Sequence, residues 1–208
     1  TVKAYIFCSA TINNYEYLKK IDFSKALVVC ADGGYEHAKT LGLVPNAIIG
    51  DSDSYLNEIP KEIEFYKYPK DKDFTDTNLC IDYVIKKDCR DITLIGGIGG
   101  RLDHEFSHFC LMKYALEREA KLKIIDEKNE VWMEKSDFNI IKNEKKYVSF
   151  FPYGGSVNGL CISGLKYEVS NMTLECGSVQ ASSNEFLDKE VAHISFKGGT
   201  LLVMRCND

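Results

Sequence analysis

The hydrophobic pattern of the chain changes at about residue 126. Before that point, short apolar runs alternate with segments of helical spacing. The strand-like runs cover residues 4–8, 26–30, 47–49, 64–68, 92–95 and 121–125. Helix candidates cover residues 35–41, a segment after Thr75, and residues 105–119. Strands that alternate with helices predict a mostly parallel sheet with right-handed crossovers.

The two longer helix candidates also have amphipathic spacing. After Thr75, one helical face carries Leu79, Tyr83 and Lys86, and Cys80 and Val84 lie beside them. Such spacing is typical of an amphipathic helix that packs against a sheet. Thr75 or Asp76 can cap this helix. The later helix carries an apolar stripe at Phe106, Phe109 and Met112.

After residue 126 the apolar runs become shorter and glycines separate them. Residues 147–151, 160–162, 172–174 and 192–196 are strand-like, and residues 197–200 (KGGT) have the composition of a hairpin turn. Many short strands with glycine turns predict a small antiparallel sandwich or barrel. We therefore expect an α/β domain over residues 1–126 and an all-β domain over residues 127–208.

Composition and charge narrow the classes of function. Hydrophobic residues make up 45% of the 208 residues and charged residues 27%, as in ordinary globular proteins. A formal net charge of -5 argues against a non-specific nucleic-acid binder. No apolar run approaches the roughly 18 residues that cross a bilayer. The eight cysteines form no C-x-x-C pair, which favours reduced thiols in a cytoplasmic protein.

Acidic or glycine-rich turns follow several of the predicted strands. Asp32-Gly33-Gly34 comes directly after one apolar run, and Asp51 and Asp53 come directly after the next. Further along, similar turns contain Asp71, Asp73 and Asp76, and then Arg101 and Asp103. Ligands of open α/β sheets collect outside the carboxyl ends of the strands. Hard oxygen ligands at this density suit Mg²⁺ with substrate phosphates, although solvated turns and helix caps are the alternative.

One short motif indicates a different chemistry. His104-Glu105-x-x-His108 matches the zinc metalloprotease signature, which places two histidines on one helical face. His104 lies at the helix start, directly after a glycine loop, and no third zinc ligand stands out. A zinc metallopeptidase remains an alternative at this stage.

In the second half, two features depart from an ordinary strand pattern. Tyr167 lies in a Gly-Leu-Lys-Tyr segment, and the polar run Ser182-Ser183-Asn184-Glu185 separates strand-like stretches. As a loop, the polar run needs no function. As a ligand site, it offers hydroxyl and amide groups to the edge of a polar ring.

Taken together, the motifs resemble those of one enzyme family. DGG at residue 32, GDSDS at 50, DKDFTD at 71, GGRLDH at 99 and SSNEF at 182 follow the order seen in thiamine pyrophosphokinases of the bacterial type. The resemblance spans nearly all of the chain. It implies an α/β catalytic domain, a β-rich thiamine-binding domain, and a homodimer with active sites between subunits.

The resemblance also implies roles for individual residues. Mg²⁺ and the triphosphate of ATP would be bound by Asp51, Asp53, Asp73 and Asp76. The nucleotide side would further include Asp32, Gly33, Lys72, Thr75, Arg101, Asp103 and His104. Lys72 stands where animal members often have a glutamine. Thiamine would be held by Tyr167, Ser183 and Asn184.

The implied reaction converts ATP and thiamine into thiamine diphosphate and AMP. Phosphoryl-type transfer asks a protein mainly for positioning and charge neutralisation. The thiamine hydroxyl would attack the β-phosphorus while Arg101 offsets the developing negative charge. Asp76 and Asp103 are both candidates for accepting the hydroxyl proton. A non-catalytic protein that binds nucleotide or thiamine is the other alternative.

Overall fold

The computed structural model describes residues 2–51, 59–69 and 73–208. The chain separates into two compact units, Thr1–Glu127 and Lys128–Asp208, here called the α/β unit and the β unit. The predicted fold class, an α/β region with a mostly parallel sheet followed by an all-β sandwich, is confirmed.

The α/β unit contains a parallel sheet. Each neighbouring pair of strands in it runs in the same direction. Across the sheet the strands are β6 (Lys121–Ile125), β5 (Asp91–Ile95), β1 (Lys3–Phe7), β2 (Leu27–Ala31), β3 (Ala47–Gly50) and β4 (Glu64–Lys67).

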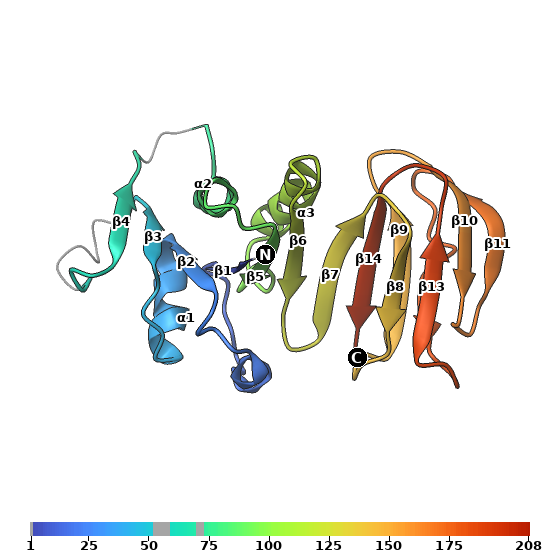
Figure 1. Ribbon diagram of the computed structural model, residues 1–208, viewed down its shortest axis with the longest axis horizontal. Coiled ribbons are helices and arrows are strands. Elements are labelled where there is room, and N and C mark those ends of the chain that lie inside the picture. The colour runs from blue at the N-terminus through green and yellow to red at the C-terminus, as the bar shows by residue number, and fades with distance from the viewer. Residues whose placement is uncertain (1, 52–58, 70–72) are drawn as a thin grey trace. The chain divides into compact units, whose positions relative to one another are not determined.

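Helices cover both faces of this sheet. Figure 1 shows α1 on one face, with α2 and α3 on the other. Because β1 lies between β2 and β5, the strand order reverses there, which is the topological switch point of a doubly wound sheet. No helix in the described part of the chain is long and apolar enough to cross a membrane. The helical segments are η1 (Glu16–Lys20), η2 (Asp32–Gly34), α1 (Tyr35–Thr40), α2 (Asp76–Lys86) and α3 (Leu102–Leu116).

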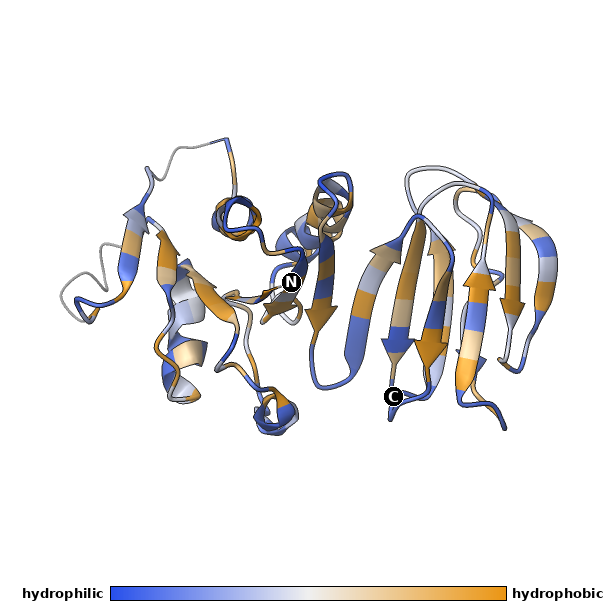
Figure 2. Ribbon diagram, viewed as in Figure 1, coloured by the Kyte–Doolittle hydropathy of each residue, from blue (hydrophilic) through white to orange (hydrophobic). Residues whose placement is uncertain are grey.

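Burial on both faces explains the continuous apolar runs of this unit. All four residues of β3 are buried, and Figure 2 shows the strand as hydrophobic along its length. By contrast, β13 (Val191–Ser195) of the β unit alternates between exposed and buried residues, as a strand with one solvated face does.

The expected helix faces were right only in part: Cys80, Val84 and Met112 are buried, but other residues of the expected faces are not. The side of α2 that is buried carries Cys80, Ile81 and Val84, whereas Leu79 and Tyr83 are only partly buried. Compact side chains at i, i+1 and i+4 let the helix approach β1, β2 and β3 closely, which the large Tyr83 ring would prevent. On α3, which begins at Leu102, Phe106 is 64% exposed instead of packed.

The β unit is a sandwich of antiparallel strands. Its core is filled from both layers, by residues such as Trp132, Phe150, Leu160 and Ile194. One layer is β12 (Asn184–Glu185), β9 (Tyr147–Pro152), β14 (Leu201–Cys206) and β7 (Asn129–Glu134). The other is β11 (Val169–Leu174), β10 (Val157–Ser163), β13 and β8 (Phe138–Ile141).

The predicted hairpin at residues 197–200 does not form. β13 pairs with β10 and β8, whereas β14 pairs with β7 and β9, so this segment carries the chain from one layer to the other. Gly199 has φ +104, and a Cβ atom there would lie 2.5 Å from the carbonyl oxygen of Ser156. Glycine is required here because two backbone segments cross closely. A tight turn requires glycine too, so the composition of the segment does not distinguish the two.

Candidate active site

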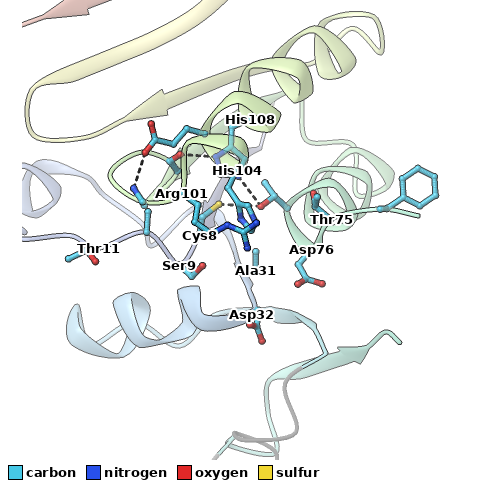
Figure 3. Close-up of a pocket in the computed structure, with 17 residues that line it drawn as sticks. Cys8, Ser9, Thr11, Ala31, Asp32, Thr75, Asp76, Arg101, His104 and His108 are labelled. Carbon is cyan, nitrogen blue, oxygen red and sulfur yellow. Dashed lines mark hydrogen bonds between the residues drawn. The ribbon is translucent and has the colours of Figure 1, made fainter. Parts of the chain in front are cut away.

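A pocket of about 490 Å³ lies at the switch point of the parallel sheet. Its wall comes from the segments that follow β1, β2 and β5, together with the first turns of α2 and α3 (Figure 3). We call it the switch-point pocket. It is lined by residues 8–11, 31–32, 74–77, 96–97, 100–101, 104–105 and 108.

The glycine loop, residues 96–100, forms one wall of this pocket. Gly96 has φ +70, and a Cβ atom on it would lie 2.5 Å from the carbonyl oxygen of Cys8. Backbone hydrogen bonds fix the same contact, since Cys8 N–H donates to Ile95 at 2.7 Å and Ala10 N–H donates to Gly96 at 3.0 Å. Only glycine allows the end of β5 to approach the end of β1 so closely.

Two aspartates enter the pocket from different elements. Asp32 follows β2, and its φ of 43 lies in the left-handed region that non-glycine residues rarely adopt. A Cβ atom at Gly50 would lie 3.1 Å from Asp32 Oδ1, so the missing side chain gives that carboxylate its place beside the end of β3. Asp76 is the first residue of α2 (Figure 3). Gly33, expected on the nucleotide side, follows Asp32 in η2 but does not line the pocket.

The cap of α2 was predicted correctly. Thr75 Oγ1 accepts a hydrogen bond from the N–H of Asn78 at 3.2 Å. The capped N-terminus of α2, which is the positive end of the helix dipole, lines the pocket beside Asp76. An anionic ligand would find unsatisfied N–H groups here.

Arg101 provides the positive side chain of the pocket. Its guanidinium donates to both carboxylate oxygens of Asp103, at 3.1 and 2.6 Å, and the N–H of His104 also donates to Asp103. These hydrogen bonds raise the pKa of Arg101 and lower the pKa of Asp103. Arg101 and His104 line the pocket whereas Asp103 does not, so Asp103 acts here by orienting Arg101.

The remaining acidic residues predicted for the site are less closely gathered. Asp51 follows β3, and Asp73 is exposed ahead of α2; neither lines the pocket. Asp53 and Lys72 lie outside the described residues. Within the described ranges, no group of three or more His, Cys, Asp or Glu side chains is placed to hold a metal ion.

The donors that do line the pocket fit magnesium bound together with phosphates. Asp32 and Asp76 offer carboxylate oxygens, the hard ligands that Mg²⁺ prefers. Mg²⁺ in phosphate-transfer sites typically needs only one or two carboxylates, because water and phosphate oxygens complete its shell. The chemistry of this donor set therefore agrees with the predicted metal without a closed protein cage.

The zinc alternative is not supported by the geometry of His108. This side chain is buried, its Nδ1 lies 2.7 Å from the carbonyl oxygen of Gly97, and its Nε2 lies 3.3 Å from Thr77 Oγ1. Both ring nitrogens thus have protein partners, and burial lowers the pKa of the ring. Glu105, the general base of the zinc motif, accepts hydrogen bonds from the glycine loop instead.

In the β unit, Tyr167 lies in the loop between β10 and β11, residues 164–168, here called the Tyr167 loop, and Ser183 and Asn184 lie at the start of β12. Tyr167 is 57% exposed, and the Lys166 ammonium lies 5.2 Å from the centre of its ring. Ser183 is exposed with φ 55, a strained conformation for a residue other than glycine. Its N–H donates to Ser149 Oγ at 2.9 Å.

Asn184 holds the Tyr167 loop by a two-point contact. Its amide oxygen accepts from the N–H of Tyr167 at 2.9 Å, and its amide nitrogen donates to the Tyr167 carbonyl at 2.8 Å. The same oxygen accepts from the N–H of Glu185 at 3.0 Å. Because the oxygen already accepts two bonds, a ligand would have to be bound through the remaining amide N–H.

Sequence reasoning missed several residues of the pocket. Ser9, Ala10 and Thr11 line it directly after β1, and Thr77 lines it from the first turn of α2. The segment after β1 carries no charge, so its composition gave no signal. The position of the segment did give a signal, because β1 adjoins the point where the strand order reverses, and ligands bind at that point.

The fold and the pocket place the chain among two-domain α/β enzymes whose ligand lies at a strand-order switch point. The model of the thiamin pyrophosphokinase catalytic domain matches residues 18–125, and that of the vitamin B1 binding domain matches residues 135–201. The chain belongs to the thiamin pyrophosphokinase family, whose members are transferases of the kinase type.

Individual relatives agree with this assignment. Thiamine pyrophosphokinase of Bacillus subtilis (strain 168) is 30% identical over 174 residues, which cover 80% of this chain and 81% of the relative. The crystal structure of thiamine pyrophosphokinase from Bacillus subtilis is similar at a TM-score of 0.89 and 26% identity, covering 99% of each chain. Yeast thiamin pyrophosphokinase shares the fold, with a TM-score of 0.79 at 18% identity over 99% of this chain and 86% of its own.

Proposed function

We propose that this chain transfers the pyrophosphoryl group of ATP to the hydroxyl group of thiamine, giving thiamine diphosphate and AMP. The observation that carries the proposal is the switch-point pocket, which is lined by one Arg, two Asp side chains and the N-terminal turn of α2. The match of two family models to the two halves of the chain supports the same reaction.

The triphosphate lies in the switch-point pocket in this proposal. Arg101 contacts phosphate oxygens through its planar donor fork, and Thr75 and His104 line the pocket on either side. Thr75 acts through the cap that presents the N-terminus of α2. A phosphate that binds Arg101 would compete with Asp103 for the same donors, so the ion pair holds Arg101 in place until the nucleotide arrives.

Magnesium would be held by Asp32 and Asp76, joined by the predicted ligands Asp51, Asp53 and Asp73. Held there, magnesium would supply positive charge that offsets the negative charge of the phosphate oxygens.

Asp76 is the better placed of the two candidate proton acceptors. Asp103 does not line the pocket, and both of its carboxylate oxygens accept hydrogen bonds from Arg101, which lower its pKa. Asp76 lines the pocket from the first turn of α2. We infer that Asp76 accepts the proton of the thiamine hydroxyl as the oxygen bonds to the β-phosphorus.

Thiamine binds to the β unit in this proposal, at Tyr167, Ser183 and Asn184. The exposed Tyr167 ring offers a face for stacking, and the exposed Ser183 offers a hydroxyl group. We further propose a cytoplasmic homodimer in which the thiamine residues of one chain complete the switch-point pocket of the other.

A product assay tests the proposed function. Purified chain, ATP, thiamine and MgCl₂ are incubated, and AMP, ADP and thiamine diphosphate are separated by chromatography. We expect AMP and thiamine diphosphate in equal amounts, with none formed when thiamine is omitted or EDTA replaces MgCl₂. Binding of both ligands without turnover would instead favour a non-catalytic protein, and sedimentation of the same sample reports whether the chain is a dimer.

A further inference from the structure

Two of the three residues of the zinc-like motif, Glu105 and His108, contact the glycine loop. Glu105 and His108 lie on successive turns of α3, three positions apart, so they project from the same side of the helix. Both line the switch-point pocket, and both form hydrogen bonds with the backbone of residues 96–100 (Figure 3). The proposed reaction assigns neither of them a role.

The hydrogen bonds of His108 have a fixed direction. The carbonyl of Gly97 can only accept, so the ring carries its proton on Nδ1, 2.7 Å away. Nε2 is then an acceptor, and the Thr77 hydroxyl donates to it at 3.3 Å. Thr77 in turn lies 3.6 Å from Cys8 Sγ, which is left as the donor of that contact. One chain of hydrogen bonds thus joins the end of β1, the first turn of α2, α3 and the glycine loop.

Glu105 holds the other end of the loop. Its Oε1 accepts from the N–H of Gly99 at 2.9 Å and from the N–H of Gly100 at 2.8 Å. Gly99 has φ +103, a conformation open to glycine, and it directs both N–H groups to the same oxygen. A carboxylate that accepts two backbone N–H groups is a strong, charge-assisted contact.

We propose that Glu105 and His108 are positioning residues that clamp the glycine loop and so fix Arg101 for the nucleotide. Arg101 follows Gly100 directly and is the residue before α3, so its backbone moves with the loop. His108 fixes the loop at Gly97 and Glu105 fixes it at Gly99 and Gly100. This inference rests on the proposed function for its kinetic effect, but the clamp itself is a property of the fold.

The clamp has one competing interpretation, which predicts the opposite sign. Two N–H groups that converge on one oxygen also form a binding site for a phosphate oxygen. If Glu105 merely occupied a phosphate site, its removal would strengthen nucleotide binding. If it holds the loop, its removal weakens nucleotide binding.

Amide exchange tests the clamp without any reference to activity. The N–H groups of Gly99 and Gly100 are measured by NMR in the parent chain, in Glu105→Ala and in Glu105→Gln. We expect Glu105→Ala to exchange at least about tenfold faster at both amides, since each loses a hydrogen bond to a charged group. Glu105→Gln keeps an acceptor oxygen and should protect them better than Ala does. Equal exchange in the parent and Glu105→Ala would overturn the clamp.

The Michaelis constants of the same variants test its purpose. Glu105→Ala should raise the KM for ATP about tenfold, with a smaller rise in Glu105→Gln. Glu117→Ala, an exposed change beyond the C-terminal end of α3, is the matched control. A KM for ATP below that of the parent would overturn the proposal in favour of an occupied phosphate site. An unchanged KM would overturn the role of the clamp in positioning.

His108 offers a second, independent pair of variants. Asn places an N–H where Nδ1 was and can still bond Gly97, whereas Gln reaches the position of Nε2 and can still bond Thr77. We expect His108→Asn to keep the KM for ATP closer to the parent than His108→Gln does, at similar melting temperatures. Equal KM values for the two would show that His108 only fills space. If the parent makes no thiamine diphosphate, the proposed function fails, while the exchange measurement still decides the clamp.

Discussion

The switch-point pocket and the Tyr167 loop present their side chains by different means. In the pocket, backbone geometry is decisive: Gly96 lets β5 meet the segment after β1, and Gly50 makes room for Asp32. At the Tyr167 loop, one buried side chain is decisive. Asn184, 2% exposed, pairs with the backbone of Tyr167 and leaves the aromatic ring in solvent.

This difference decides what each region tolerates. The carboxyl ends of parallel strands lie at one edge of a sheet, so residues far apart in sequence converge there without special contacts. An antiparallel sandwich has no such edge, and its exposed loops need individual anchors. We therefore expect changes in the pocket to affect ATP binding and the chemistry of transfer, and changes at Asn184 or Tyr167 to affect the binding of thiamine alone.

The largest effect is expected for Asp76→Asn, which keeps size and removes charge. If Asp76 accepts the proton and binds the metal, turnover should fall at least ~10²-fold, the scale of losing one transition-state contact. Asp88→Asn, just beyond the other end of α2, is the control. Steady-state rates are compared for both, and for Asp51→Asn and Asp73→Asn. Near-parental turnover of all three aspartate variants would contradict the roles assigned to Asp51, Asp73 and Asp76.

The next largest effect is expected for Arg101→Lys, which should reduce kcat/KM for ATP about tenfold although the charge is kept. Lysine cannot reproduce the planar fork that bonds Asp103 at two points. Melting temperatures decide between the alternatives. A structural ion pair at this exposed position contributes little to stability, so we expect no large shift. A lower melting temperature with parental kcat/KM would mean that Arg101 serves the fold only.

For the other region, Tyr167→Ala should raise the KM for thiamine about tenfold through lost stacking. Asn184→Ala should do the same by releasing the Tyr167 loop. The KM for ATP should change by less than about twofold in both variants. A rise in the KM for ATP equal to the rise in the KM for thiamine would contradict the separate roles of the two regions. Ile141→Ala, an exposed apolar change on β8, serves as the control in the same unit.

The last prediction concerns the rate at which two cysteine thiols are modified and does not depend on activity. Cys8 lines the pocket but is buried, and burial raises its pKa to about 12. Cys176 is exposed in the β unit. With iodoacetamide at pH 8, we expect mass spectrometry to find Cys176 modified well before Cys8. Early modification of Cys8 would show that the wall of the pocket opens in solution.

Most of the fold was predictable because its signals are local and repeated. Apolar runs alternating with helices indicated the parallel sheet, and glycine-separated strands indicated the sandwich. The prediction of a hairpin at residues 197–200 was wrong. Gly199 is needed where two backbone segments cross closely, and its neighbouring residues have the same composition as a turn. The buried face of α2 was predicted in part: Cys80 and Val84 lie on it, whereas the large Tyr83 ring is only partly buried.

The site was predictable to a lesser degree. Asp32, Asp76 and Arg101 reach the pocket as their positions after strands predict. The clamp by Glu105 and His108 was not predictable from the sequence, because the same residues match a zinc motif. Only the fold shows that both ring nitrogens of His108 have hydrogen-bond partners in the protein. The anchoring role of Asn184 depends on a contact between two layers of the sandwich, which sequence spacing does not encode.

The fate of labelled phosphate tests the central claim most directly, that the chain moves a pyrophosphoryl group as one piece. ATP labelled with ³²P at the β-position is incubated with thiamine, MgCl₂ and the chain, and the products are separated. We predict that the label appears in thiamine diphosphate and that the AMP formed is unlabelled. Label retained in ADP, with thiamine monophosphate as the other product, would contradict the account.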